Sequence, residues 1–251
     1  MIGIIFAAGI GSRLKPFTDS HPKALAPLGG VPMITRVARK LLEAGARRLI
    51  VNVHHFPQQI IDEINRSPFA DLVEISDESD LLLDTGGALA KIALHSRVFA
   101  SAEDDEPVVV HNADIYTDFP IEEMVTRHTD TSAGATILVD PSRNSSRHFL
   151  FSSDGQLHGW ENSDKGITRP EGLSTNGLSA AAFGGIHILT PTTIRNIAQS
   201  GISPFSIVDW YLNNCNTETI LGYTPSAPYL WHDIGTSEKL AAAEKAIAEQ
   251  G

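Results

Sequence analysis

The chain begins with a short run of uncharged apolar residues, Ile2 to Phe6, which leads directly into the glycine-containing residues 7–13 (AAGIGSR). An uncharged run of this length is typical of a strand that is buried on both faces. The small residues that follow allow the backbone to approach a ligand closely, with its N–H groups directed at that ligand. Since Arg13 and then Lys23 add positive charge, we interpret this stretch as a site for the phosphates of a nucleotide.

Apolar runs alternate with amphipathic segments along the chain. The spacing predicts strands at residues 2–6, 49–53, 72–75, 107–111 and 135–139, and helices at 33–44, from 57, at 85–94 and at 121–127. The later residues predict a hairpin of 149–152 with 157–160, a loop at 161–174, strands at 181–189, 219–221 and 229–232, and helices from 191, at 204–212 and at 236–249. This alternation predicts an α/β fold with a Rossmann-like, three-layer α/β/α arrangement and a mostly parallel central sheet. We expect the small β-hairpin to form a lid at the edge where ligands bind.

Composition restricts the classes of partner. The chain has 251 residues and a net charge of −11, so we expect one domain, residues 1–251, without general affinity for nucleic acid or an anionic membrane. The single cysteine, Cys215, excludes an internal disulfide and a cysteine-rich zinc site. No apolar run is long enough to span a bilayer and no signal peptide precedes Ile2, so we expect a cytoplasmic protein.

Three known patterns compete for the glycine-containing segment. A dinucleotide-binding turn, G-x-G-x-x-G, fits Gly9 and Gly11, but Leu14 replaces the third glycine and no acid ends the next strand. A phosphate loop, G-x-x-x-x-G-K-[ST], does not occur in the chain. Residues 7–33 match a longer pattern, A-A-G-x-G-x-R-L-x-P-x-T followed by P-K-A-L-x-P-L-x-G-x-P-M. On this pattern the chain resembles the sugar-1-phosphate nucleotidyltransferases, which join a nucleoside triphosphate to a sugar phosphate and release pyrophosphate.

The resemblance implies the nucleotide-diphospho-sugar transferase fold and assigns roles to the opening stretch. Residues 1–140 would form the nucleotide-binding half, and residues 141–251 the sugar-phosphate-binding half with the closing helix. Arg13 and Lys23 would be catalytic residues that neutralise phosphate charge, and Lys23 would also hold the sugar phosphate. The nucleotide-binding residues that the resemblance implies are Ala7, Ala8, Gly9, Gly11, Ser12, Thr85, Gly86 and Asn112.

Two aspartates at the ends of expected strands are candidate ligands for a divalent cation. Asp114 lies in the string HNAD, and Asp233 lies in WHDIGT before the closing helix. From position alone, an Asx turn or a helix cap explains such residues as well. The resemblance implies that both aspartates bind Mg²⁺ and that Asp114 is catalytic, and carboxylate and phosphate oxygens suit this ion. Ala113 stands where the family usually has glycine.

Weaker matches concern the base and the sugar. Residues 84–88 (DTGGA) correspond to a family string that contacts the nucleobase and usually begins with glutamate. In the string WEN, Glu161 and Asn162 lie near the E-K-P of many relatives, so they are candidate sugar-phosphate-binding residues, although a solvated loop explains Glu161 as well. Arg143 and Arg147 either meet an acidic group on the substrate or are simply solvated.

The choice of substrate follows from similarity over nearly the full length. The strings VNVHHFPQQI, DTGGALAKI and WHDIGTSEKLAAAE resemble the compact subgroup that contains N-acetylmuramate-1-phosphate uridylyltransferase. We therefore expect UTP, N-acetylmuramate 1-phosphate and Mg²⁺, in a monomer or homodimer. Mannose- or heptose-1-phosphate guanylyltransferases and phosphocholine cytidylyltransferases share much of the signature and stay open as alternatives. A catalytically silent nucleotide-binding regulatory subunit is a further alternative, which the charged candidate residues argue against.

Overall fold

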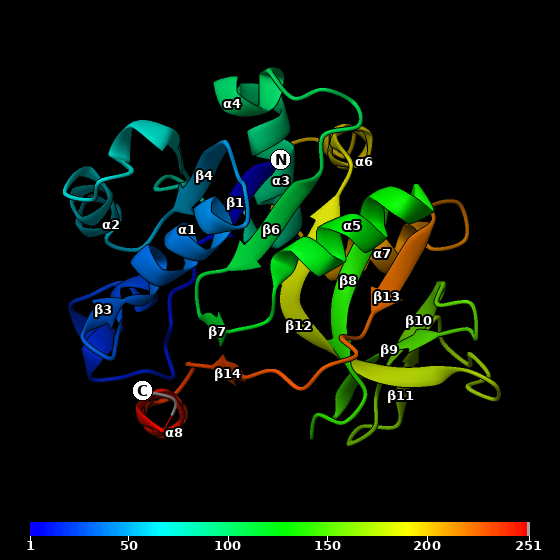
Figure 1. Cartoon of the computed structure of the whole chain (residues 1–251). Coiled ribbons are helices and arrows are strands. Elements are labelled where there is room, and N and C mark those ends of the chain that lie inside the picture. The colour runs from blue at the N-terminus through cyan, green and yellow to red at the C-terminus, as the bar shows by residue number, and fades with distance from the viewer. Residues whose placement is uncertain (250–251) are drawn as a thin grey trace.

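A ten-stranded mixed sheet forms the centre of the molecule, described here for residues 1–249 from a computed structural model. Its strands are β1 (Ile2–Phe6), β4 (Arg48–Val53), β5 (Val73–Asp77), β6 (Val108–Asn112), β8 (Ala135–Asp140), β9 (Arg147–Phe151), β10 (Leu157–Asn162), β11 (Ile167–Arg169), β12 (Ser179–Leu189) and β13 (Ile220–Tyr223). Eight of them follow the order β11-β10-β9-β12-β6-β1-β4-β5, and β8 pairs with β12 and β13 (Figure 1). The central strands β6, β1, β4 and β5 are parallel, whereas β12 is antiparallel to β6, β8 and β9.

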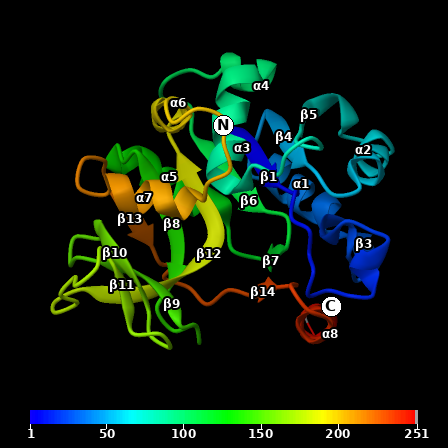
Figure 2. The ribbon, with the colours of Figure 1, turned by 180° about the vertical axis from the view of Figure 1, so that it is seen from behind.

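Helices cover both faces of this sheet, as the strand–helix alternation predicts. One hydrophobic cluster contains residues of α1 (Met33–Glu43), α2 (Pro57–Asn65), α5 (Ile121–Thr131) and α8 (Ser237–Ala248). The other contains residues of α3 (Asp84–His95), α4 (Arg97–Ala100), α6 (Pro191–Ala198) and α7 (Ile207–Asn214). Figure 1 shows α5 in front of the sheet, and Figure 2 shows α7 in front of its other face. Side chains alternate along β1, so Ile5 packs into the first cluster while Ile2 and Ile4 pack into the second. The three-layer fold is therefore confirmed.

The antiparallel extension of the sheet, formed by β9, β10 and β11, differs in part from the sequence prediction. The hairpin of β9 and β10 is confirmed. The prediction of a loop at 161–174 is wrong in part, because β10 continues to Asn162 and β11 pairs with it, with Glu161 opposite Thr168. These segments are too short and too polar for strand periodicity to be read from the sequence. β9 pairs with β12, so the extension continues the main sheet, and its action as a lid stays a prediction.

Two short strand pairs complete the fold. β7 (Ile115–Thr117) pairs antiparallel with β14 (Trp231–Asp233), and β2 (Pro27–Leu28) pairs antiparallel with β3 (Val31–Pro32). β14 corresponds to the strand predicted at 229–232 and α7 to the helix predicted at 204–212, and both predictions begin too early. In α7 the cap is Ser206, whose hydroxyl accepts a hydrogen bond from the Val208 N–H at 3.2 Å.

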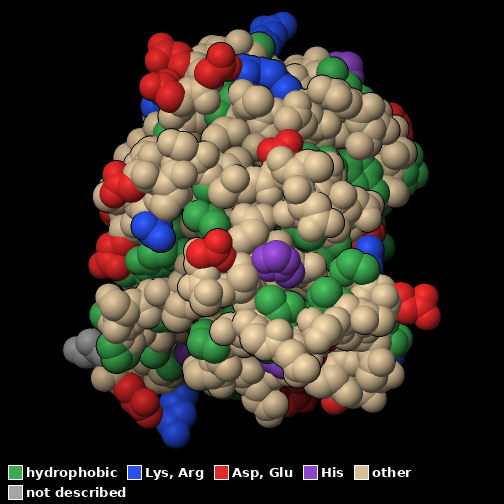
Figure 3. All heavy atoms as spheres, turned by 90° about the vertical axis from the view of Figure 1, so that its right-hand side faces the viewer, with side chains coloured by type: hydrophobic (Ala, Val, Ile, Leu, Met, Phe, Trp, Pro, Cys, Tyr) green, Lys and Arg blue, Asp and Glu red, His purple; other side chains and the backbone are tan. Residues whose placement is uncertain are grey.

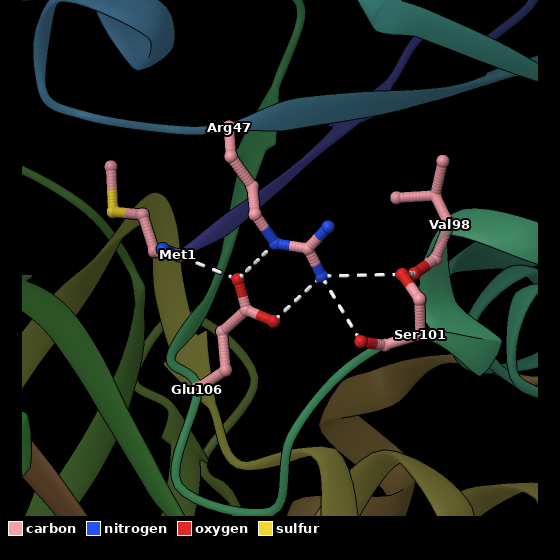
Figure 4. A network of polar contacts seen from close by, with 5 residues as sticks. All are labelled: Met1, Arg47, Val98, Ser101 and Glu106. Carbon is pink, nitrogen blue, oxygen red and sulfur yellow. Dashed lines mark hydrogen bonds and ion pairs between the residues drawn. The ribbon is translucent and has the colours of Figure 1, made fainter.

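A polar network ties together the amino-terminal ends of the central strands (Figure 4). The Arg47 guanidinium donates to both carboxylate oxygens of Glu106, at 2.6 and 2.8 Å, and to the Ser101 carbonyl at 3.2 Å. The Met1 amino group lies 3.4 Å from the same Glu106 carboxylate. Because these residues precede β1, β4 and β6, the carboxyl ends of the three strands meet at the opposite edge, where ligands bind in open α/β sheets.

Charged side chains are scattered over the face of the molecule that Figure 3 shows. On the side that lies at the right in Figure 1, Lys and Arg side chains stand apart from one another among acidic and uncharged ones (Figure 3). Within residues 1–249, no helix combines the length and the apolar character needed to cross a bilayer. A cytoplasmic location, and the absence of nucleic acid and membrane partners, stay predictions.

Candidate functional site

A cavity of about 350 Å³ lies at the carboxyl ends of β1, β4 and β6. It is lined by Phe6, Ala7, Ala8, Gly9, Lys23, Ala24, Asn52, Glu78, Leu82, Asp84, Thr85, Asn112, Ala113 and Asp114. The structure thus brings together many of the residues predicted from the sequence, namely Ala7, Ala8, Gly9, Lys23, Thr85, Asn112 and Asp114. Cavities that bind small molecules have volumes of roughly 300–1,000 Å³, so this one is large enough for a ligand.

A buried hydrogen-bond network holds the first residue of the opening loop. The Ala7 N–H donates to Asn52 Oδ1 at 2.7 Å, and the Asn52 side-chain amide donates to Glu78 Oε1 at 2.9 Å. Glu78 Oε2 accepts from the Leu83 N–H at 3.2 Å. Burial raises the pKa of Glu78, although the hydrogen bonds from Asn52 and Leu83 act in the opposite direction. One buried carboxyl group therefore joins three chain segments that surround the cavity.

Gly11 fixes the path of the loop against Lys23. Its φ is +68°, and a Cβ atom at this position would lie 2.8 Å from Lys23 Cβ and 3.0 Å from Thr18 Cγ2. Around Gly9, by contrast, a Cβ atom would have nothing within 4 Å, so this glycine leaves open space beside the cavity. Gly11 is thus required by its left-handed backbone and its close neighbours, whereas no packing contact requires Gly9, which lines the cavity.

Ser12 and Arg13 lie at the rim of the site and are exposed. The Arg13 guanidinium comes within 3.4 Å of the position that a Cβ atom of Gly235 would occupy, and Gly235 follows Asp233 by two residues. Arg13 therefore lies beside the loop that carries the second predicted metal ligand.

Asp114 and Asp233 are far apart in the sequence and adjacent in the structure. β14 pairs with β7 so that Asp233 lies opposite Ile115, and the Ile234 N–H donates to the Asp114 carbonyl at 3.0 Å. The Lys23 ammonium donates to Asp114 Oδ2 and lies 3.9 Å from Asp233 Oδ1. The two predicted metal ligands and Lys23 are therefore in one place, beside the cavity.

A second lysine, Lys239 in the first turn of α8, contacts Asp233 from the other side. Its ammonium lies 2.6 Å from Asp233 Oδ2. Burial acts to raise the pKa of Asp233, but the hydrogen bond from Lys239 and the charges of Lys23 and Lys239 outweigh it, so this pKa lies below its ordinary value. Asp233 is therefore ionised at neutral pH and available as a ligand.

The donor set suits a hard divalent cation that binds together with its substrate. Asp114 and Asp233 offer carboxylate oxygens on either side of Lys23. In the described part of the chain, no three His, Cys, Asp or Glu side chains are grouped so as to hold a metal ion. Mg²⁺ is usually held by one or two carboxylates, with water and substrate phosphates completing its octahedron, rather than by an all-protein cage. Two convergent aspartates beside a nucleotide-sized cavity therefore fit Mg²⁺.

The start of α3 is shaped by packing as well as by the cavity. A Cβ atom on Gly86 would lie 2.2 Å from the Phe205 ring, and the Gly86 N–H donates to the Phe205 carbonyl at 2.8 Å. The Thr85 hydroxyl accepts from the Ile207 N–H at 2.9 Å. Asp84 and Thr85 line the cavity, while Gly86 is buried against Phe205. Close packing alone accounts for the missing side chain of Gly86, and its contact with a nucleobase stays a prediction.

Glu161 and Asn162 lie on β10 and have partners within the sheet extension. Glu161 Oε1 is 3.4 Å from His148 Nδ1. Asn162 is buried, and its side-chain oxygen accepts from the Lys165 N–H at 3.3 Å. Neither residue is among those that line the cavity described above, so their binding of a sugar phosphate stays a prediction.

The two loop arginines differ from each other. The Arg143 guanidinium lies 3.5 Å from the centre of the Trp231 ring and donates to the Phe183 carbonyl at 2.8 Å. Trp231 precedes Asp233 by two residues, so Arg143 lies beside the site. Arg147 is exposed at the start of β9.

Sequence reasoning missed the roles of Asn52, Glu78 and Lys239. Asn52 and Glu78 lie at or just beyond the ends of β4 and β5, and a polar residue at the end of an apolar run was the available signal. Lys239 stands six positions after Asp233, where the turn before α8 brings it back to that carboxylate. Asn52 and Lys239 lie within strings that resemble the compact subgroup, VNVHHFPQQI and WHDIGTSEKLAAAE, but that resemblance assigns neither of them a role, and Glu78 lies in no such string.

Sequence similarity covers nearly the whole chain. The profile of the family described as "Nucleotidyl transferase" matches residues 2–250. The N-acetylmuramate alpha-1-phosphate uridylyltransferase of Caulobacter vibrioides is 26% identical, over 99% of this chain and 97% of that protein. The mannose-1-phosphate guanyltransferase of Yarrowia lipolytica is 26% identical, over 77% of this chain and 50% of that protein. The chain thus spans about half the length of the curated guanylyltransferases that it matches.

Structural similarity supports the fold independently. HddC from Yersinia pseudotuberculosis superposes with a TM-score of 0.72 at 20% identity, and the alignment covers 98% of this chain and 99% of that one. The crystal structure of HddC in complex with GMP-PN gives the same values. The fold implied by the opening stretch is therefore confirmed.

Proposed function

Because the chain belongs to the nucleotidyl transferase family, we propose that it transfers a nucleotidyl group from a nucleoside triphosphate to a sugar 1-phosphate and releases pyrophosphate. The observation that carries this proposal is the convergence of Asp114, Asp233 and Lys23 beside the cavity of the opening loop. The attacking phosphate oxygen is already an anion, so attack on the α-phosphorus needs no general base. The barrier comes from bringing two anions together, and positioning with charge neutralisation lowers it.

The opening loop would hold the triphosphate. In this scheme the backbone N–H groups of Gly9, Gly11 and Ser12 donate to phosphate oxygens, and the hydrogen bond from Ala7 to Asn52 keeps the loop in place. Arg13, at the rim beside Asp233, would neutralise charge that develops on the α-phosphate and on the leaving pyrophosphate.

Lys23 and the two aspartates would act at the point of transfer. The Lys23 ammonium would hold phosphate oxygens of both substrates, since its stem is fixed against Gly11 at the wall of the cavity. Asp114 and Asp233 would hold Mg²⁺, which when bound supplies a Lewis acid for the phosphoryl oxygens. The carboxylates themselves orient Lys23 and keep its ammonium next to the transferred phosphate.

For the substrates, the proposal is UTP and N-acetylmuramate 1-phosphate. It is supported by the Caulobacter vibrioides relative, with which the alignment covers almost all of both chains. GTP with mannose or heptose 1-phosphate is the second candidate, favoured by the guanylyltransferase relatives and by the GMP-PN complex of a protein of the same fold.

The test is pyrophosphate release with each of the four nucleoside triphosphates against a panel of acceptors. The panel contains N-acetylmuramate 1-phosphate, mannose 1-phosphate, a heptose 1-phosphate and phosphocholine, with Asp114→Asn as the inactive control. Fastest turnover with UTP and N-acetylmuramate 1-phosphate is the expected result. Turnover restricted to GTP would select the second candidate. Absence of turnover with every pair would instead favour a regulatory nucleotide-binding subunit.

A further inference from the structure

We propose that Lys239 is a tethered counter-ion, which pairs with Asp233 until a metal–nucleotide complex arrives and then pairs with the polyphosphate. The inference rests on the proposed function, because it takes Asp233 as a ligand of Mg²⁺. It concerns the loading of the site: Lys239 opposes binding of the free cation and favours binding of the cation together with its nucleotide.

The two lysines that contact the aspartates differ in their freedom to move. The side chain of Lys23 is only 11% exposed, and its Cβ would lie 2.8 Å from a Cβ atom on Gly11. The side chain of Lys239 is 50% exposed and reaches Asp233 Oδ2 from the first turn of α8. A cation that takes Asp233 Oδ2 therefore displaces the ammonium of Lys239, whereas the stem of Lys23 stays fixed against Gly11.

Displacement has a different outcome for the two forms of the cation. A free divalent cation brings a like charge to the ammonium and offers it no new partner, so the ion pair with Asp233 is lost. A metal–nucleotide complex brings phosphate oxygens, which an ammonium binds with charge-assisted hydrogen bonds. The backbone of Lys239 is held by the Thr236 cap, whose hydroxyl accepts from the Lys239 N–H at 3.3 Å, so the ammonium stays near the site.

The experiment measures binding of Mn²⁺, the paramagnetic substitute for Mg²⁺, by electron paramagnetic resonance. Wild type is compared with Lys239→Met, and Lys245→Met is the matched control. Lys245 lies on the same helix, is 80% exposed and pairs at 3.8 Å with Glu249. We expect Lys239→Met to bind free Mn²⁺ about two- to fivefold more tightly, the range for losing one solvent-exposed ion pair. With UTP present, the same variant should bind the Mn²⁺–UTP complex less tightly than wild type does.

The outcomes separate this inference from the proposed function. Equal Mn²⁺ affinities for Lys239→Met and Lys245→Met would overturn the inference, and so would equal tightening with and without UTP. Asp233→Asn tests the premise, since it should weaken Mn²⁺ binding in every background. If it leaves Mn²⁺ binding unchanged, the metal site of the proposed function and this inference both fall. Circular dichroism of each variant checks that the fold is intact.

Discussion

Candidate functional residues lie in two regions of the molecule, the carboxyl edge of the parallel strands and the antiparallel extension. Their surroundings differ between the two regions. At the parallel edge, Asp114 and Asp233 converge on Lys23 beside a cavity. In the extension, Asn162 is buried and holds a turn, and Glu161 faces His148. Polar side chains therefore serve a shared cavity in one region and local structure in the other.

The difference shows that a side chain is a candidate for chemistry when its polar atoms point at space that protein atoms do not fill. Asp114 belongs to a cavity wall, whereas the Asn162 side chain is occupied by the backbone of its own turn. Parallel strands favour the first case because all their carboxyl ends lie on one edge. Hairpin strands end at alternating edges, so their polar ends are separated.

The largest effect that we expect is on the rate. Asp114→Asn removes a charge at the point of transfer and should lower kcat by about 100- to 1,000-fold, the range for a lost electrostatic contact at a transition state. Glu161→Gln makes the same chemical change in the extension and should alter kcat by less than about threefold. Pyrophosphate release at saturating substrates measures both variants.

One result would contradict the predicted difference between Asp114→Asn and Glu161→Gln. If Glu161→Gln raises KM for the sugar phosphate tenfold and leaves KM for the nucleotide unchanged, the extension belongs to the site. Asp233→Asn provides the second arm, because its effect should resemble that of Asp114→Asn.

Much of the fold follows from local sequence signals. The parallel core was predictable because its strands, such as residues 2–6, are uncharged runs between amphipathic helices. The strands β7 and β11 each have three residues, which is too few for a period of two to be recognised. Their pairing depends on partners that lie elsewhere in the chain, such as β14 for β7.

The site was predictable only where a continuous motif covers it. Residues 7–33 carry a long pattern, so Gly9, Gly11 and Lys23 were found. Glu78 lies in no such pattern, and the string that contains Lys239 assigns it no role. The roles of both residues arise from hydrogen bonds to Asn52 and Asp233 that only the fold creates. The glycine at position 86 was predicted to contact a base, and the structure supplies packing against Phe205 as a sufficient reason for it.

Two glycine substitutions sharpen the distinction between open space and packed space. Gly86→Ala places a methyl group 2.2 Å from the Phe205 ring, so it should lower the free energy of unfolding by about 1–3 kcal/mol. Gly9→Ala meets nothing within 4 Å and should leave stability within about 0.5 kcal/mol of wild type. Its methyl group would enter the cavity and raise KM for the nucleoside triphosphate about tenfold. Urea unfolding and steady-state kinetics measure the two effects, and an unchanged KM in Gly9→Ala would place the phosphates elsewhere.

Two buried asparagines, Asn52 beside the cavity and Asn162 in the extension, allow a comparison with smaller expected effects. Asn52→Ala leaves the Ala7 N–H and Glu78 Oε1 without their partner, so it should cost about 2 kcal/mol of stability and also raise KM for the nucleotide. Asn162→Ala removes the side-chain hydrogen bond to the Lys165 N–H and should cost about 1 kcal/mol with KM for the nucleotide unchanged. Urea unfolding and substrate titrations test the pair. Equal changes of KM for the nucleotide in both variants would contradict this expectation, because they would mean that the extension contributes to nucleotide binding as much as the opening loop does.

The smallest expected effect is a pH dependence of the free energy of unfolding, which comes from a buried core histidine and not from the candidate site. Burial lowers the pKa of His128 to about 4. Between this value and the ordinary value of about 6.5, the unfolded chain binds a proton that the folded chain does not, so stability falls as the pH is lowered through this window. From pH 7 to pH 5.5 the loss of unfolding free energy from this residue is about 1 kcal/mol, and His128→Leu should remove that part of the pH dependence measured by urea unfolding.

Metal binding should not follow this pH dependence. The pKa of Asp233 lies below its ordinary value, so its carboxylate stays charged at pH 5.5. The folded protein should therefore keep its affinity for Mn²⁺ at pH 5.5, and a loss of that affinity while the fold is intact would show that the charge of Asp233 is not what holds the metal.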